Sequence, residues 1–321
     1  MGRCSKTLVA NMEKKIDTPI TLFSLSFFGG QLPDLLTVLT ERLTEGARGD
    51  NETLTVATPN PEQVIQTRNN PEFLRALQTM NVRLPDGIGL LYASKILSMR
   101  YGGPTLRHRI GGRDVVARLL AWADGEPITV LVIGGRGLGV RSDAEGYLVR
   151  SSNRSEGGKS VVTDRLDDTL ARLKPVFVPS ELSNSHWLWT EAYQDAKDAT
   201  LEEEATLRAI LEDLQPDLVL VALGAPDQEL WLDSHRELLS ATGVKVAMAV
   251  GGALDVLTGA LRQPPAWIER ANLEWAFRLW QQPWRWKRQL RLLQFGGLVL
   301  RGLIDRSVGQ PVEQTVDHTA S

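Results

Sequence analysis

The fold is decided by the stretch TLTVATPNPE at residues 53–62, together with LPDG at residues 84–87. The first is a β-rich apolar run that ends in small polar groups and a proline. The second places a carboxylate on a glycine turn just before an apolar helix. In an open parallel sheet, ligands bind where strands end and helices begin. We therefore regard Thr58, Asn60 and Asp86 as candidates for one cleft.

Strand-like and helix-like segments alternate on both sides of this stretch. Apolar runs predict strands at residues 20–27, 54–58, 82–84, 128–133, 218–223 and 244–250. Helical spacing predicts helices at residues 32–43, 61–68, 71–80, 88–97, 114–123, 201–214 and 226–239. Such alternation is typical of an α/β fold, here a Rossmann-like, mostly parallel sheet with flanking helices. Residues 141–200 do not follow the pattern, and we expect them to be divergent and partly flexible.

The composition is that of a soluble globular protein, with 321 residues, 42% hydrophobic, 23% charged and a net charge of −3. That balance gives no general attraction to nucleic acid, and we find no nucleic-acid-binding motif. The single cysteine forms no internal disulfide, and the four histidines lack the spacing of metal ligands. The chain shows no secretory signal and no uninterrupted apolar run of about 18 residues. We expect a cytoplasmic protein.

We divide the chain into a Rossmann-like domain at residues 19–262, a helical appendage at residues 263–306, and flexible tails at residues 1–18 and 307–321. Between Arg262 and Arg306 the sequence holds nine basic side chains, three acidic ones and five of the nine tryptophans. Interleaved Trp, Arg and Leu suit the surface of an anionic membrane. The alternative is a helical hairpin packed on the domain with its tryptophans in the core, and we expect both to be partly true.

Glycine-rich turns follow three of the predicted strands, at Gly134-Gly135, at Gly224 and at Gly251-Gly252. Backbone N–H groups in such turns, together with a helix N-terminus, can bind an anion. Each turn taken alone is also explained as a tight connection. None of them is the G-x-G-x-x-G fingerprint of a dinucleotide site.

Asp86 is the candidate general base, because a carboxylate at a strand end can take a proton from an attacking hydroxyl. The simpler alternative is that it caps the helix that follows it. Asp255 is a rival base with the same alternative. Arg109 shares a loop with Arg107 and Arg113, and arginine holds phosphate oxygens in a bidentate grip. A charge-rich loop is also commonly just solvated.

Six motifs stand in the order found in the WecG/TagA/CpsF glycosyltransferase family, glycosyltransferase family 26. They are TPNPE at 58–62, LPDG at 84–87, RIGGRD at 109–114, GAPDQE at 224–229, GGALD at 251–255 and PAW at 265–267, the last followed by LEW at 273–275, Arg278, Pro283, Arg285 and Arg288. Over roughly residues 20–290 the chain resembles this family.

The resemblance implies transfer, with inversion, of an N-acetylmannosamine-type sugar from a UDP-sugar to a polyprenyl-diphosphate-linked acceptor in surface polysaccharide biosynthesis. It also implies a protein held peripherally at the cytoplasmic membrane surface, on the inner face of the cell membrane. The alternative from another class is a non-catalytic nucleotide-sugar-binding or membrane-adaptor protein on the same scaffold. Whether the chain forms a homo-oligomer stays open.

Residue roles follow from the resemblance by position. Asp86 would be the general base, with Gln228 at the donor and Arg109 near its diphosphate. Thr58 and Asn60 would line the sugar pocket. The other candidate substrate-binding residues are Gly134, Gly135, Gly224, Gly251, Gly252, Asp255, Arg278, Arg285 and Arg288. The chain has no Asp-x-Asp pair, the usual ligand of a divalent ion in glycosyltransferases. We therefore predict that the enzyme needs no metal or other cofactor and that arginines stabilise the departing UDP.

Overall fold

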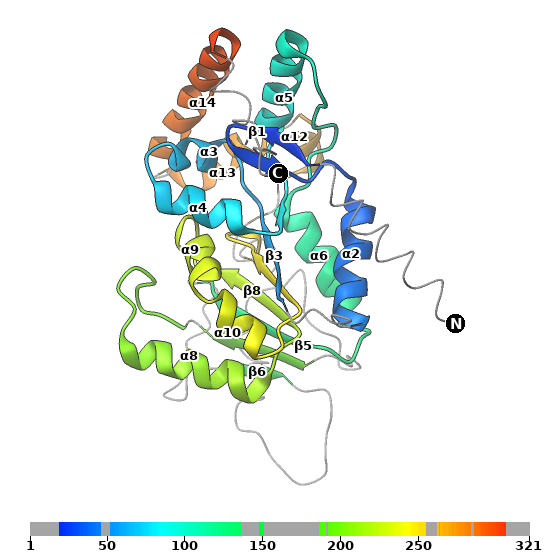
Figure 1. Cartoon of the computed structure of the whole chain (residues 1–321), viewed down its shortest axis with the longest axis vertical. Coiled ribbons are helices and arrows are strands. Elements are labelled where there is room, and N and C mark those ends of the chain that lie inside the picture. The colour runs from blue at the N-terminus through cyan, green and yellow to red at the C-terminus, as the bar shows by residue number, and fades with distance from the viewer. Residues whose placement is uncertain are drawn as a thin grey trace, which may run out of the picture.

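The computed structural model describes residues 19–45, 52–135, 148–150, 186–190, 192–254, 262, 264–271, 273–283 and 286–305. The two predicted tails, at residues 1–18 and 307–321, lie outside these residues. Within them, the predicted α/β architecture is confirmed: a central sheet is flanked by helices on both faces (Figure 1).

Within the described residues, the sheet has seven strands in the order β4-β3-β9-β8-β5-β7-β6. The strands are β3 (Leu54–Ala57), β4 (Val82–Arg83), β5 (Thr129–Gly134), β6 (Leu148–Arg150), β7 (His186–Thr190), β8 (Leu218–Ala222) and β9 (Val246–Ala249). Every neighbouring pair is parallel except β6 and β7, so the sheet is mostly parallel, as predicted. From β3 the chain moves outward to β4 and then crosses back to β5, so that the sheet is wound in two directions.

Successive side chains of a strand point to opposite faces, and β5 shows how this builds the core. Val130 and Val132 pack with α2 (Leu32–Glu45) and α6 (Gly112–Ala123). Leu131 and Ile133 pack on the other face with α8 (Leu201–Leu214) and α9 (Asp227–Ser234). All four β5 side chains are at most 1% exposed. A strand buried on both faces reads as a continuous apolar run, which explains why this strand was predictable.

The remaining helices are α3 (Pro61–Thr67), α4 (Pro71–Thr79), α5 (Ile88–Tyr101), α10 (Arg236–Ala241), α12 (Ala266–Arg270), α13 (Glu274–Gln281) and α14 (Trp286–Ile304). α14 packs on α3 and α5, and its Phe295 meets Phe23 edge to face with ring centroids 5.5 Å apart. The C-terminal segment is therefore helical and packed on the domain. Its four described tryptophans are nevertheless 46–69% exposed, so they do not fill a core; they are Trp267, Trp275, Trp280 and Trp286.

Two element predictions are wrong. Residues 20–27 do not form one strand but an antiparallel hairpin of β1 (Ile20–Leu22) and β2 (Leu25–Phe27), separate from the main sheet. Phe23 and Ser24 make the turn with φ of 52° and 68°, a conformation that the apolar sequence does not signal. The single helix predicted at 226–239 is two helices, α9 and α10, which meet at His235.

Two strands were missed in the segment at residues 141–200. β7 runs parallel to β5, and β6 pairs antiparallel with β7 at the edge of the sheet. Both are short, and neither has the long aliphatic run by which the central strands were recognised. The sheet therefore continues through part of the region that we expected to be divergent.

Candidate functional site

The carboxyl ends of the parallel strands meet along one edge of the sheet. Most of the predicted site residues with described positions follow these ends: Thr58 and Asn60 after β3, Asp86 after β4, Gly224 and Gln228 after β8, Gly251 and Gly252 after β9. β4, β3, β9 and β8 are consecutive in the sheet, so these residues lie on neighbouring strands. Gly134 and Gly135 close the adjacent strand β5.

Asp86 does not cap the helix that follows it. The N-cap residue of α5 is Gly87, and none of the described side chains caps that end. The carboxylate of Asp86 instead accepts a hydrogen bond from the backbone N–H of Gly112, at the start of α6. Its own backbone N–H donates to the carbonyl oxygen of Pro59, at 3.1 Å. The N-terminus of α6 carries partial positive charge, which favours a carboxylate at this position.

Gly112 allows α6 to begin this close to β3. A Cβ atom on Gly112 would lie 2.9 Å from Cγ2 of Thr58, closer than side chains pack. Thr58 is consequently only 8% exposed. The α6 terminus, Thr58 and Asp86 are thus held together by close contact.

α13 supplies two charged side chains to Asp86 and its neighbours. Glu274 accepts two hydrogen bonds from the guanidinium of Arg109, at 2.7 and 2.8 Å, although the two residues are 165 positions apart. Arg109 Nε in turn lies 3.8 Å from a carboxylate oxygen of Asp86. One helical turn beyond Glu274, Arg278 donates to the carbonyl oxygen of Gly252, at 3.2 Å. Residues four apart share a helix face, so α13 presents both to the same edge of the sheet.

The charges around Asp86 act in opposite directions on its pKa. Burial raises the pKa of Asp86, Arg109 and Arg278 lower it, Glu274 raises it, and the Gly112 N–H lowers it; the net pKa lies above the usual range of aspartate. The side chain is still 32% exposed, so a substrate can reach it. For Arg109, burial lowers the pKa, but the hydrogen bonds to Glu274 and the nearby Asp86 outweigh this and raise it.

A second group of polar side chains, which we call the amide cluster, consists of Gln63, Gln228 and Glu229. One carboxylate oxygen of Glu229 accepts from the amide nitrogens of Gln63, at 3.0 Å, and of Gln228, at 2.8 Å. The amide oxygen of Gln228 accepts from the backbone N–H of Gly251, at 2.9 Å. Glu229 is completely buried, its other oxygen has no hydrogen-bond partner among the described residues, and burial raises its pKa to about 7.

Several predicted ligand groups already make contacts within the protein. Asn60 caps α3, because its side-chain oxygen accepts from the backbone N–H of Gln63 at 3.1 Å. Gly135 donates its N–H to the carbonyl oxygen of Ala222 at 3.1 Å, which ties β5 to β8. A Cβ on Gly134 would lie 2.9 Å from the Ala222 backbone, so this glycine permits the close approach of the two strands. Roles for these residues in substrate binding stay predictions.

Two of the predicted residues lie outside the described part of the chain, and a third is described only in its backbone. Asp255, the rival base, and Arg285 lie outside the described residues. The backbone of Arg288 belongs to α14, and its side chain is outside the described part of the chain. Sequence reasoning also missed partners that the structure supplies, chiefly Glu274 and Glu229. Both stand within motifs quoted for the resemblance, LEW at 273–275 and GAPDQE at 224–229, which was the signal that could have found them.

The described residues lack two features that bear on the chemistry. They contain no group of three or more His, Cys, Asp and Glu side chains that could hold a metal ion. Activity without a metal stays a prediction. None of the helices in the described ranges is both long and apolar enough to cross a membrane.

The chain is similar in sequence to known proteins over most of its length. Residues 20–154 and 186–308 match the sequence model of the glycosyl transferase WecG/TagA/CpsF family. The N-acetylglucosaminyldiphosphoundecaprenol N-acetyl-beta-D-mannosaminyltransferase of Bacillus subtilis (strain 168) is 29% identical over 266 residues, which cover 82% of this chain and 85% of that protein. The protein of the same name from Bacillus spizizenii (strain ATCC 23059 / NRRL B-14472 / W23) is 28% identical over 246 residues, 77% of this chain and 78% of that protein. The chain is a glycosyltransferase and belongs to the WecG/TagA/CpsF family.

Proposed function

We propose that this glycosyltransferase moves an N-acetylmannosamine-type sugar from a UDP-sugar to a polyprenyl-diphosphate-linked N-acetylglucosamine, in surface polysaccharide biosynthesis. The two Bacillus relatives carry names with this type of sugar and acceptor. The observation that carries the proposal is the position of Asp86, a reachable carboxylate at the start of α6 and 3.8 Å from Arg109.

Asp86 acts as the general base. Its carboxylate takes the proton of the acceptor hydroxyl as that oxygen forms a bond to the anomeric carbon of the donor sugar. The bond from this carbon to the diphosphate oxygen breaks at the same time, and UDP leaves with the electron pair. Attack opposite to the leaving group inverts the anomeric centre. The raised pKa of Asp86 makes it a stronger base than an ordinary aspartate.

Arginines stabilise the negative charge that develops on UDP. Arg109 is held in place by Glu274, and Arg278 is anchored on the Gly252 carbonyl, so both guanidinium groups are oriented before substrate arrives. Preoriented charge at the point where charge develops is commonly a large contribution to catalysis. Arg285 and Arg288 would add to this group from the C-terminal segment.

The C-terminal segment holds the enzyme at the membrane that contains its acceptor. Four tryptophans of α12, α13 and α14 are exposed, together with Leu293, Leu300 and Ile304 of α14. Exposed tryptophan and basic side chains on helices suit the interface of an anionic bilayer. In the full chain, Trp267→Glu combined with Trp280→Glu, at two exposed positions, should release the protein from phosphatidylglycerol vesicles in a flotation assay; unchanged flotation would reject this part of the proposal.

The proposed reaction is tested with the full chain, UDP-N-acetylmannosamine and N-acetylglucosaminyl diphosphate carrying an undecaprenyl chain. We expect release of UDP, formation of a disaccharide and, by proton NMR, a β-linkage from the α-configured donor. Parallel reactions with UDP-N-acetylglucosamine and with excess EDTA test the donor and the metal independence. UDP binding without turnover of any donor would favour the nucleotide-sugar-binding alternative.

A further inference from the structure

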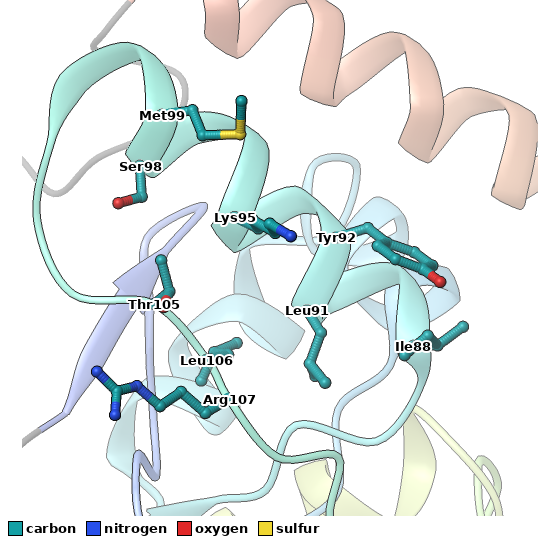
Figure 2. A pocket seen from close by; sticks show the side chains of 9 residues that line it. All are labelled: Ile88, Leu91, Tyr92, Lys95, Ser98, Met99, Thr105, Leu106 and Arg107. Atoms are coloured by element: carbon teal, nitrogen blue, oxygen red, sulfur yellow. The ribbon is translucent and has the colours of Figure 1, made fainter.

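A groove of about 510 Å³ runs along the outer side of α5, between this helix and the loop that follows it (Figure 2). The helix supplies Ile88, Leu91, Tyr92, Lys95, Ser98 and Met99, and the loop supplies Thr105, Leu106 and Arg107. Tyr92 and Met99 are 59% and 80% exposed, so apolar surface of α5 is left open to solvent. None of these nine residues belongs to the site described above.

The groove starts beside that site. Ile88 at one end is two positions after Asp86, and Arg107 is two positions before Arg109. From Ile88 to Met99 the helix extends about 16 Å away from Asp86, the length of a few isoprenoid units. The C-terminal end of α5 projects from the molecule next to α14 (Figure 1). There the Tyr101 hydroxyl donates a hydrogen bond to the carbonyl oxygen of Leu303 in α14, at 2.9 Å.

The chemistry of the groove suits an amphiphilic anion. Its nine lining residues include the cations Lys95 and Arg107 and no acidic side chain. Within the described part of the chain, neither cation makes an ion pair. The neighbouring helix α14 carries further exposed apolar side chains, Leu300 and Ile304, which are 63% and 88% exposed. A ligand with a diphosphate at one end and a long apolar chain would match both features.

We propose that this groove binds the lipid part of the acceptor: the first isoprenoid units lie along α5, and Lys95 and Arg107 contact the diphosphate. This deepens the proposed function, on which it rests, by naming a second binding surface for the acceptor outside the C-terminal segment. The bound chain continues past Met99 toward the exposed apolar residues of α14. The acceptor sugar is thereby directed toward Asp86.

A chain-length comparison tests the proposal. Two acceptors carry the same N-acetylglucosaminyl diphosphate, one on an undecaprenyl chain in detergent and the other on a hexyl chain. Met99→Glu should raise the KM for the long-chain acceptor about tenfold, because a charge replaces apolar contact, and leave the short-chain and donor KM nearly unchanged. Lys95→Glu and Arg107→Glu should raise the KM for both acceptors. Leu201→Glu, at an apolar residue of α8 that is 91% exposed, is the matched control and should change none of them.

A binding measurement separates this proposal from the proposed reaction. By isothermal titration, wild type should bind farnesyl diphosphate, and Met99→Glu should weaken that binding about tenfold without altering the affinity for inorganic diphosphate. This result would support the groove even if no donor is turned over. Equal effects of Met99→Glu on both acceptors, or farnesyl diphosphate binding that Met99→Glu leaves unaltered, would overturn the proposal. Loss of flotation of Met99→Glu on acceptor-free vesicles would also overturn it, because that result indicates a general membrane contact. So would a different molecular mass of Met99→Glu by light scattering, because that result indicates a contact between two copies.

Discussion

Two carboxyl groups lie near the same edge of the sheet in opposite surroundings. Asp86 lies near the guanidinium groups of Arg109 and Arg278 and is 32% exposed. Glu229, in contrast, is fully buried and accepts hydrogen bonds from the neutral amides of Gln63 and Gln228. Burial raises the pKa of both. At Asp86 the arginines oppose this rise, and the carboxylate can meet a substrate. At Glu229 the carboxylate can only hold its neighbours in place, so we assign the first to chemistry and the second to architecture.

The largest expected effect comes from replacing each acid by its amide. Asp86→Asn removes the base and should lower kcat by about a thousandfold or more. Glu229→Gln keeps an oxygen that can accept from both amides, so its kcat should stay within about threefold of wild type. Initial rates with the lipid acceptor measure both variants, and circular dichroism melting shows whether each is folded. Similar losses in the two variants would remove the distinction between the acids.

The next effect concerns stability. Glu229→Leu leaves the amide nitrogens of Gln63 and Gln228 buried without an acceptor, which should lower the free energy of unfolding by about 2–5 kcal/mol. Urea denaturation measures this loss, with Glu229→Gln as the matched control. If Glu229→Leu is as stable as Glu229→Gln, the amide cluster does not stabilise the turns that follow β8 and β9.

Stability should also depend on pH through Glu229. Its pKa is about 7 in the folded protein against an ordinary value of 4.5, so folding favours the protonated form. The stability that this group contributes is complete below pH 4.5 and is lost as the pH rises through 7. The total loss is on the order of 3 kcal/mol, since each unit of pKa difference corresponds to about 1.4 kcal/mol. Urea midpoints at pH 5 and pH 8 should differ in wild type and differ less in Glu229→Gln; equal differences would contradict this assignment.

The smallest expected effect sharpens the account of Asp86. The negative charge of Glu274 raises the pKa of Asp86, so Glu274→Gln should lower that pKa. Because the base is lost on protonation, the acid limb of the pH profile of kcat/KM should move to lower pH. Glu202→Gln, at an exposed position of α8, is the control and should leave the profile unchanged. A shift of the Glu274→Gln profile to higher pH would contradict the assignment of that limb to Asp86.

The features of the fold and the site that local residue patterns encode could be predicted from the sequence. The apolar run before residue 58 and the turn at Asp86 were recognisable because strand ends in a parallel sheet have a local signature. The pairing of Arg109 with Glu274 was not, since nothing in either segment indicates a partner 165 positions away. Glu229 was missed for a related reason. Acidic side chains are mostly exposed to solvent, so the sequence alone does not indicate that the acid next to Gln228 is buried. The hairpin turn at Phe23 was hidden because its apolar residues are unusual in that backbone conformation.

The central claim is that Asp86 removes a proton on one side of the donor sugar while Arg278 receives UDP on the other. A crystal structure with UDP-N-acetylmannosamine and an N-acetylglucosaminyl diphosphate analogue tests it most directly. We predict the Asp86 carboxylate within hydrogen-bonding distance of the acceptor hydroxyl, with the donor diphosphate beside Arg278 on the opposite side of the anomeric carbon. A structure in which the diphosphate lies on the same side as Asp86, or in which Asp86 contacts no sugar, would contradict the claim.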